Sequence, residues 1–427
     1  MNSWVPGADG SGFGVENLPY GVFSTEGVAG RTGPRVGTRI GGHILDLAAV
    51  ARAGLLDGAA PNALAVFSAP LLNPFMAYGR PVWTAVRRRL RELLAADIVA
   101  ARDHRAELEA ALVRVEAVRM HLPVVVADYV DFYSSLDHAE NLGRMFRPDA
   151  APLLPNWRHL PVGYHGRAGT LVVSGTPVRR PNGQRRQSDG EVAFGPSARL
   201  DIELEVGFLV GATSEHGQPV PGSAVADHVF GVVLVNDWSA RDIQAWEYQP
   251  LGPFLGKSFA TSMSAWVTPL DALQPARVPP PMQEPPPLPY LTIDEPWGLD
   301  IDLEVALRPG ADQPEHVIAR TNFAPMYWTV AQQLAHMTVN GASLRTGDLF
   351  ASGTVSGPGP KERGSLIELS WNGTDPIELA HGISRSFLED GDEVVLRGST
   401  AAGGARIDLG ECRGRIEPAT HLPGEWM

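Results

Sequence analysis

Acidic and apolar residues alternate at two places in the sequence, and such a pattern can create a cation site. Residues 201–206 read DIELEV, which predicts a strand whose apolar side chains face a core while its carboxylates share the opposite face. Glu203 and Glu205 would then lie about 7 Å apart, close enough to bind one hard cation together. Residues 300–305 read DIDLEV, so alternation alone does not distinguish a metal site from an ordinary solvated strand face.

Three other features offer chemistry, and each has a structural alternative. Asp237 follows the apolar run 229–235, so it should end a buried strand, where a carboxylate requires a partner; a turn aspartate is the commoner case. His138 would be a candidate general base if a carboxylate orients it and a cation lies nearby, but a lone histidine is more often structural. Residues 352–357, SGTVSG, would either bring backbone amides and a hydroxyl to a ligand or simply form a turn.

Lysine is rare in this chain, because only Lys257 and Lys361 among its 35 basic residues are lysines. A compact ammonium serves chemistry that a planar guanidinium does not, so Lys257 is a candidate functional residue. The GKS sequence around it is not a phosphate-binding loop, since Leu251 occupies the position of that motif's first glycine. The sequence also lacks the zinc-protease, serine-hydrolase and dinucleotide-binding motifs.

The surrounding pattern predicts a mainly β protein with some α-helix. Short apolar runs at 36–40 and 43–47 indicate strands of a small β unit, and apolar residues recur at helical spacing between 81 and 115. We therefore expect an N-terminal domain over 1–120 and a largely β domain over 121–427. The strands expected in the second domain are 124–127, 171–173, 200–210, 229–235, 301–307 and 393–397.

Composition limits the class of protein. The 427 residues carry a net charge of −13 and are 44% hydrophobic, which predicts a folded chain and argues against nucleic-acid or anionic-membrane partners. A single cysteine, Cys412, cannot form an internal disulfide and fits a reducing compartment. No run approaches the 18 to 20 or so apolar residues of a membrane span, and the first 25 residues do not resemble a secretory signal. We expect a soluble, cytoplasmic protein.

Several long, aromatic-rich segments follow one another in a characteristic order. They include NLPYGVFST at 17–25, DFYSS at 131–135, PNWRHLPVGYHG at 155–166, NDWSARDIQ at 236–244 and PLGPFLGKSF at 250–259. Through these segments the chain resembles, over nearly its full length, the fumarylacetoacetate hydrolase family.

The resemblance implies both a fold and a reaction. The fold would be a small N-terminal Src-homology-3-like β-barrel and a larger C-terminal mixed β-roll or β-sandwich domain, assembled as a homodimer. The reaction would be hydrolysis of 4-fumarylacetoacetate, a small dicarbonyl acid, to fumarate and acetoacetate, the last step of tyrosine and phenylalanine breakdown. It would depend on Ca²⁺, Mg²⁺ or both.

The resemblance also assigns residues to roles. The metal ligands would be Asp131, Glu203, Glu205 and Asp237, and two residues near a second, Mg²⁺-type position would be Lys257 and Thr261. His138 would be the base, with Glu368 holding it, while positive charge or hydrogen-bond donors for the oxyanion would come from Lys257, Arg241 and Gln244. The substrate contacts would be Tyr133, Arg147, Arg241, Gln244, Tyr248 and Thr354. Asp137 departs from the animal pattern and could alter the protonation of its neighbour His138.

These residue types suit the reaction. Cleavage of a carbon–carbon bond by water requires a nucleophile at neutral pH and stabilisation of the departing enolate, which a general base and a divalent cation would supply. The fork of Arg147 suits a terminal carboxylate of the substrate. Two alternatives remain: a related metal-dependent hydratase, decarboxylase or tautomerase of 2-keto acids, and a non-catalytic cation-binding module.

Overall fold

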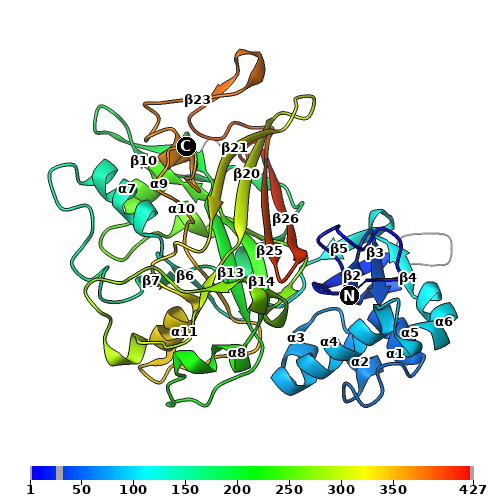
Figure 1. The fold of residues 1–427 in the computed structure, drawn as a ribbon. Helices are drawn as coiled ribbons and strands as arrows, with labels where there is room; N and C mark the ends of the chain where they lie inside the picture. Colours follow the sequence, from blue (N-terminus) through cyan, green and yellow to red (C-terminus); the bar gives the residue numbers. More distant parts are fainter. Residues whose placement is uncertain (1, 26–31, 424–427) are drawn as a thin grey trace.

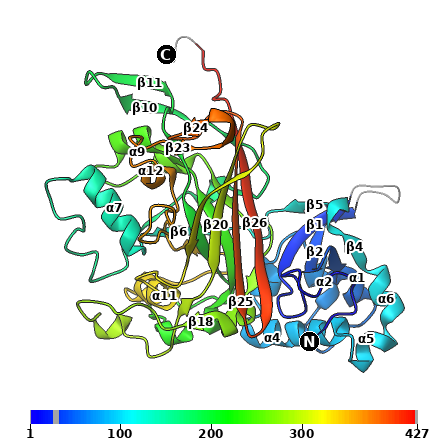
Figure 2. The ribbon, with the colours of Figure 1, turned by 45° about the horizontal axis from the view of Figure 1, so that its top comes forward.

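The computed structural model describes residues 2–25 and 32–423, and shows a smaller N-terminal part, in blue, beside a larger part (Figures 1 and 2). The smaller part is built on a curled, antiparallel five-stranded sheet, a half-barrel. In their order across the sheet, its strands are β4 (Leu112–Arg114), β3 (His43–Asp46), β2 (Thr32–Ile40), β1 (Tyr20–Thr25) and β5 (Val118–His121).

Helices cover this sheet, and the longest of them carries the predicted apolar stripe. Helix α4 (Arg80–Leu94) buries Trp83, Val86, Leu90 and Leu93, which recur at a spacing of three or four residues. The stripe expected to continue to residue 115 is only partly helical, because the chain enters strand β4 at Leu112. The other helices here are α1 (Leu47–Arg52), α2 (Ala63–Phe67), α3 (Asn73–Met76), α5 (Val99–Asp103) and α6 (Arg105–Ala110).

The larger part contains a mixed sheet of eight strands. Seven of them lie in the order β7 (Gly163–His165), β6 (Tyr129–Phe132), β22 (Leu349–Ala351), β13 (Leu204–Val210), β14 (Val229–Asp237), β16 (Thr261–Met263) and β8 (Leu171–Val173), and β17 (Thr268–Pro269) also pairs with β14. The pairs β6–β22 and β16–β8 are parallel, and the other pairs are antiparallel. The strand expected at 124–127 is wrong, since β6 begins at Tyr129.

A second sheet packs on one face of the first, in front of β13 and β14 in Figure 1. Its strands lie in the order β21 (His316–Asn322), β20 (Asp302–Pro309), β25 (Asp392–Ala402), β26 (Ala405–Glu417) and β9 (Val178–Arg179). Inward side chains of the two sheets, such as Leu204 and Leu234 from the first and Leu303 and Leu396 from the second, form one core. The predicted fold class, mainly β with a small N-terminal sheet and a larger mixed-sheet part, is therefore confirmed.

The N-terminal part covers the opposite face of the eight-stranded sheet. Phe230 of β14 packs against Tyr20 of β1 and Trp83 of α4, with ring centroids 5.6 and 5.2 Å apart. Strands β13 and β14 are thus buried on both faces, which explains their nearly continuous apolar runs. Whether the domain boundary falls at residue 120 stays a prediction; β5 ends at His121.

The remaining elements surround these sheets. Short antiparallel pairs join β10 (Asn182–Arg186) to β11 (Val192–Pro196), β12 (Leu200–Asp201) to β15 (Ser239–Ala240), β18 (Arg277–Val278) to β19 (Gly298–Leu299) and β23 (Ile377–Glu378) to β24 (Ser384–Arg385). The helices are α7 (Leu136–Phe146), α8 (Val225–His228), α9 (Arg241–Glu247), α10 (Leu255–Ser258), α11 (Val330–Thr338) and α12 (Leu366–Leu369). Among the described residues, no helix combines the length and apolar character needed to cross a membrane.

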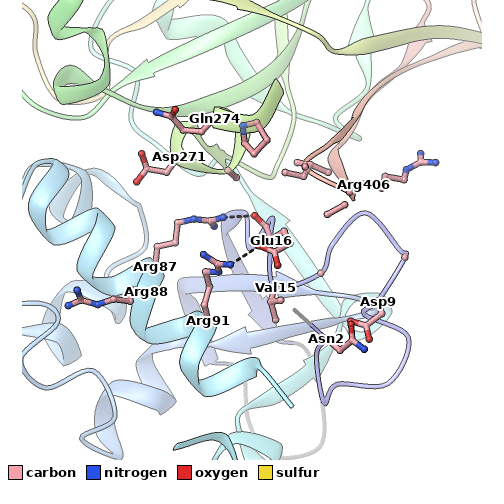
Figure 3. Close-up of a pocket in the computed structure, with 18 of the residues that line it drawn as sticks. Asn2, Asp9, Val15, Glu16, Arg87, Arg88, Arg91, Asp271, Gln274 and Arg406 are labelled. Atoms are coloured by element: carbon pink, nitrogen blue, oxygen red, sulfur yellow. Dashed lines mark hydrogen bonds and ion pairs between the residues drawn. The ribbon is translucent and has the colours of Figure 1, made fainter. Parts of the chain in front are cut away.

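A cleft of about 520 Å³ lies between the two parts (Figure 3). Arg87 donates to the backbone carbonyls of Glu16 and Asn17, and Arg91 pairs with the Glu16 carboxylate at 2.8 Å. Of the residues described in the structure, none that the sequence predicts for the site lines this cleft. Its arginines hold the N-terminal segment against α4.

Candidate metal centre and active site

Four carboxylates from three strands of the eight-stranded sheet converge at one place. Asp131 lies on β6, Glu203 directly precedes β13, Glu205 lies within it, and Asp237 ends β14. Each contributes an oxygen to a cluster whose members all lie within 4.8 Å of one another, and all four residues are buried. Antiparallel pairing sets Glu205 opposite Val235, so the start of β13 and the end of β14 bring their carboxylates to the same end of the sheet.

The second alternating segment, DIDLEV at 300–305, has a different environment. Asp300 and Asp302 both accept hydrogen bonds from the Asn322 amide, at 2.7 and 2.9 Å, and Glu304 pairs with Arg397 at 3.1 Å. Asp300 and Asp302 are exposed, and Glu304 is half-buried. These carboxylates form surface contacts on β20, so the same sequence pattern has produced a solvated face here and a buried cluster in the first copy.

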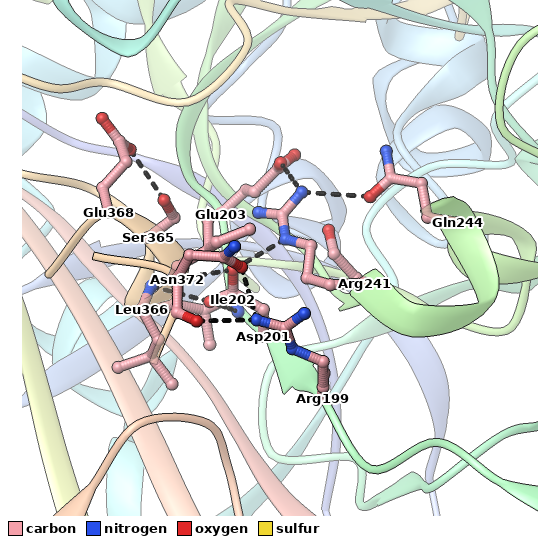
Figure 4. Close-up of polar contacts among 12 residues, drawn as sticks. Arg199, Asp201, Ile202, Glu203, Arg241, Gln244, Ser365, Leu366, Glu368 and Asn372 are labelled. Carbon is pink, nitrogen blue, oxygen red and sulfur yellow. Dashed lines mark hydrogen bonds and ion pairs between the residues drawn. The ribbon is translucent and has the colours of Figure 1, made fainter. Parts of the chain in front are cut away.

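A lysine and an arginine balance part of the cluster's negative charge. The Lys257 ammonium donates to Glu203, and to Asp237 at 2.8 Å. Burial alone would lower the pKa of Lys257, but Asp237 and Glu203 outweigh burial and raise it, so this side chain stays protonated. Arg241 of α9 contacts Glu203 at 2.8 Å and Gln244 at 3.2 Å (Figure 4). Although burial opposes ionisation of Glu203, the two cations hold its pKa at about 2.

The other carboxylates have little compensation. Oδ1 of Asp131 and both carboxylate oxygens of Glu205 accept no hydrogen bond within the described part of the chain. Burial, together with repulsion from neighbouring carboxylates, raises the pKa of both groups well above the ordinary range. Buried acceptors without donors are costly, and several carboxylate oxygens around one point match the ligands of Ca²⁺ and Mg²⁺. The residues present therefore fit a divalent cation.

His138 and Glu368 form a buried pair. The imidazole Nδ1 lies 2.7 Å from Glu368 Oε2, and Asn141 donates to Oε1 of the same carboxylate at 2.9 Å. Burial opposes ionisation of Glu368, but attraction to His138 and the hydrogen bonds from His138, Asn141 and Ser365 lower its pKa to about 2. An ionised Glu368 accepts a hydrogen bond from the Nδ1–H, which leaves Nε2 as the basic nitrogen of the ring.

The helix that carries His138 also explains the place of Asp137. Ser135 caps α7 by accepting a hydrogen bond from the backbone N–H of His138 at 3.2 Å. Burial, with repulsion from Glu140 and Glu368, raises the pKa of Asp137. In the residues that the structure describes, the Asp137 carboxylate makes no hydrogen bond with the imidazole.

The residues expected to contact substrate differ in their burial and in their hydrogen-bond partners. The ring of Tyr133 packs edge-on against His138 with centroids 5.2 Å apart, and the buried Thr354 hydroxyl accepts or donates no hydrogen bond among the described residues. Arg147 donates to the carbonyl of Pro152 at 2.7 Å and keeps a buried Nε without a described partner. Tyr248, by contrast, is 46% exposed and lies outside the buried network of the cluster.

Sequence reasoning did not identify Tyr164 as a site residue. Its hydroxyl donates to Asp237 Oδ2 at 3.3 Å, and the Thr261 hydroxyl donates to Oδ1 of the same carboxylate at 3.2 Å. Tyr164 and Lys257 also line a cavity of about 300 Å³. The one sequence signal for Tyr164 is its place in the aromatic-rich segment 155–166.

The glycine-rich segment 352–357 packs beside the site, and a methyl group at Gly353 is expected to destabilise the protein. Gly353 has φ +76°, and a Cβ there would collide with the backbone carbonyl of Phe132 on the strand that carries Asp131. We expect Gly353→Ala to lower the free energy of unfolding by about 2 kcal/mol or more in urea denaturation. Gly42→Ala, where a Cβ meets no atom within 4 Å, is the control; equal stability of the two variants would contradict the prediction.

Comparison with known proteins covers almost the whole chain. Residues 16–123 match the family described as fumarylacetoacetase N-terminal, and residues 128–417 match the fumarylacetoacetate (FAA) hydrolase C-terminal family. The chain is 50% identical over 419 residues to a fumarylacetoacetase of Rattus norvegicus, covering 98% of this chain and 99% of the relative. It is 51% identical over 422 residues to that of Caenorhabditis elegans, covering 98% and 100%.

Solved structures of lower identity share the fold. A fumarylacetoacetate hydrolase from psychrophilic Exiguobacterium antarcticum aligns with a TM-score of 0.52 at 16% identity, covering 93% of this chain and 99% of that structure. A putative HpcE protein from Mycobacterium smegmatis aligns with a TM-score of 0.54 at 17% identity and the same coverage. With matches to both family models and half-identical relatives along its length, this chain belongs to the fumarylacetoacetate hydrolase family.

Proposed function

We propose that this protein hydrolyses a carbon–carbon bond of 4-fumarylacetoacetate, yielding fumarate and acetoacetate as the last step of tyrosine and phenylalanine breakdown. The observation that carries the proposal is a buried cluster of four carboxylates near a His138–Glu368 pair, in a chain whose full-length relatives are named fumarylacetoacetase. A histidine that activates water favours hydrolysis over decarboxylation and tautomerisation, whereas a hydratase is distinguished by its product.

The acidic cluster would hold a divalent cation, Ca²⁺ or Mg²⁺. Its ligands would come from Asp131, Glu203, Glu205 and Asp237. When bound, the ion would polarise both oxygens of a 1,3-dicarbonyl and stabilise the enolate that departs. Thr261 and Lys257, which both contact Asp237, would border a second, Mg²⁺-type position.

His138 would act as the general base through Nε2. Because Glu368 fixes the Nδ1–H, Nε2 can take a proton from the water that attacks the carbonyl beside the fumaroyl group. The same carboxylate stabilises the imidazolium that forms, since its low pKa keeps it ionised. The proton on Nε2 is then available to the enolate carbon of the departing acetoacetate.

The cationic residues would complete the site. Lys257 stays protonated and has three donors but no lone pair, so it can donate to a developing oxyanion and cannot serve as a base. Arg241 contacts Glu203 and also Gln244, and both Arg241 and Gln244 would supply further donors. A terminal carboxylate of the substrate would be bound by Arg147, Tyr133 and Thr354. Within the described residues, Arg147 Nε and the Thr354 hydroxyl have no hydrogen-bond partner.

A direct assay tests the proposal. Purified protein with added Mg²⁺ or Ca²⁺ is mixed with fumarylacetoacetate, and loss of the dicarbonyl absorbance is followed while fumarate and acetoacetate are quantified. Stoichiometric formation of both acids supports the hydrolase. Formation of a hydrated, decarboxylated or tautomerised product, or metal binding without any turnover, would contradict it.

We also propose a homodimer in the cytoplasm. Large apolar side chains lie exposed in one segment, with Leu251 97% and Phe254 59% exposed, and Trp246 of the same segment contacts Gln184 of the β10–β11 hairpin. Burial raises the pKa of the Cys412 thiol to about 12, so this thiol is unreactive. A buried, unreactive thiol is compatible with the reducing compartment that we propose.

Replacement of Leu251 tests this surface as a dimer interface. Sedimentation velocity of the wild-type protein is expected to give the mass of two chains, because apolar area of this kind is stabilised by burial. Leu251→Asp should shift the protein to the mass of one chain. Met282→Asp, at a position 91% exposed in another segment, is the control and should remain dimeric. A wild-type protein with the mass of one chain would overturn the proposal.

A further inference from the structure

Asp201, the first residue of the DIELEV segment, is completely buried yet belongs to neither the acidic cluster nor the histidine pair. Its carboxylate accepts four hydrogen bonds. The donors are the backbone N–H groups of Ile202 at 2.7 Å, Leu366 at 2.7 Å and Ile367 at 3.1 Å, and the Arg241 side chain at 2.7 Å (Figure 4). A buried carboxylate with four donors is well compensated, so both of its oxygens are held firmly.

One end of this network leads to the acidic cluster. Arg241 uses Nε to contact Asp201 and Nη1 to contact Glu203 at 2.8 Å, and the same Nη1 reaches Gln244. The guanidinium is planar, so fixing Nε and Nη1 fixes its orientation. Asp201 therefore sets how Arg241 faces the metal ligand Glu203.

The other end leads to the base. Leu366 and Ile367 belong to the single helical turn α12, which lies 165 residues along the chain from Asp201. The next residue of that turn is Glu368, which holds His138 Nδ1 at 2.7 Å. Anchoring of α12 by Asp201 thus places the carboxylate that orients the imidazole.

We propose that Asp201 is a positioning residue that fixes the His138–Glu368 pair relative to Arg241 and the acidic cluster. This inference rests on the proposed function, since it assigns Asp201 a role in the same reaction. Because Arg241 and α12 are bound to the same carboxylate, they move together, and displacements of about 1 Å are enough to reduce turnover strongly.

Substitution by asparagine disturbs these contacts. Oδ1 of Asp201 accepts from the N–H groups of Ile202 and Leu366, and Oδ2 accepts from Arg241 and the N–H of Ile367. The amide has one acceptor oxygen, so its NH₂ group must face one of these two pairs of donors, donor against donor. With saturating Mg²⁺ we expect Asp201→Asn to lower kcat at least tenfold while KM and the Mg²⁺ dissociation constant change less than threefold. Asp300→Asn is the matched control, because Asp300 opens the second copy of the motif and lies exposed; its kcat should equal that of the wild type.

A spectroscopic readout separates positioning from general stability. The downfield NMR resonance of the His138 Nδ1 proton, assigned by its loss in His138→Ala, is expected to shift in Asp201→Asn and to stay unchanged in Asp300→Asn. If Asp201→Asn does not fold, Asp201→Glu keeps the charge but moves it by one methylene group, and its kcat should fall at least threefold. Wild-type kcat in the folded variant, or a lowered kcat with an unshifted resonance, would overturn the inference.

The same measurements distinguish failure of this inference from failure of the proposed function. A wild-type protein that does not turn over fumarylacetoacetate would refute the reaction. The NMR comparison of Asp201→Asn with the wild type would still decide whether Asp201 positions the imidazole, because that comparison requires no substrate.

Discussion

Turnover of fumarylacetoacetate is expected to fall to the background rate when divalent cations are removed with a chelator and their absence is verified by elemental analysis. Four buried carboxylates lie close together, and within the part of the chain that the structure describes only Lys257 and Arg241 form ion pairs with them. An anionic substrate would be repelled by this cluster unless a cation neutralises it. Restoration of turnover by added Mg²⁺ or Ca²⁺ completes the measurement, and undiminished hydrolysis in the verified metal-free protein would contradict the metal centre.

A matched pair of variants locates the cation. Glu205→Gln replaces a carboxylate whose oxygens have no described hydrogen-bond donor, so we expect its Mg²⁺ or Ca²⁺ affinity in calorimetry to fall about 100-fold or more. Glu304→Gln changes the corresponding position of the second motif, where the carboxylate pairs with Arg397 and Arg320. Equal affinities of the two variants would show that the cation binds elsewhere.

The second large effect is expected from His138→Ala, which should lower kcat by about two to four orders of magnitude while cation affinity is retained. The imidazole supplies the proton acceptor Nε2, and its hydrogen-bond partner is Glu368 rather than one of the four clustered carboxylates. Removal of the ring therefore leaves the carboxylates in place. Steady-state kinetics and calorimetry on the same preparation measure both quantities.

Another histidine supplies the control for this variant. The ring of His336 is half-buried, its Nδ1 lies 3.0 Å from the Tyr290 hydroxyl, and no hydrogen bond or ion pair joins it to the acidic cluster among the described residues. His336→Ala should keep the wild-type kcat. If His138→Ala also retained the wild-type kcat, another group would have to activate water.

Secondary structure could be predicted from sequence wherever it depends on a local pattern of apolar and polar residues. Alternation and apolar runs predicted the strands around β13 and β14, and helical spacing predicted α4. The strand expected at 124–127 instead begins at Tyr129, because β6 is stabilised by parallel pairing with β22, more than 200 residues away. Such a partner has no signal in the local pattern.

The arrangement of the site could be predicted only in part. The family motifs named the four clustered carboxylates and the His138–Glu368 pair, but not Tyr164, whose hydroxyl reaches Asp237 from another strand. The role proposed for Asp201 was equally invisible, because its partners Leu366 and Ile367 contribute backbone N–H groups, which every sequence offers.

By itself the sequence determined the family, the strands around β13 and β14, and the shared side on which Glu203 and Glu205 lie, because these depend on residue type and on a period of two. Tertiary structure alone decided which of the two alternating patterns became part of a buried carboxylate cluster. The neighbours of DIELEV bury its three acids and leave Glu205 without a donor among the described residues, whereas DIDLEV faces Asn322 and Arg397 at the surface. Burial and partners come from residues distant in the chain, and it is they that set the cost of a charge.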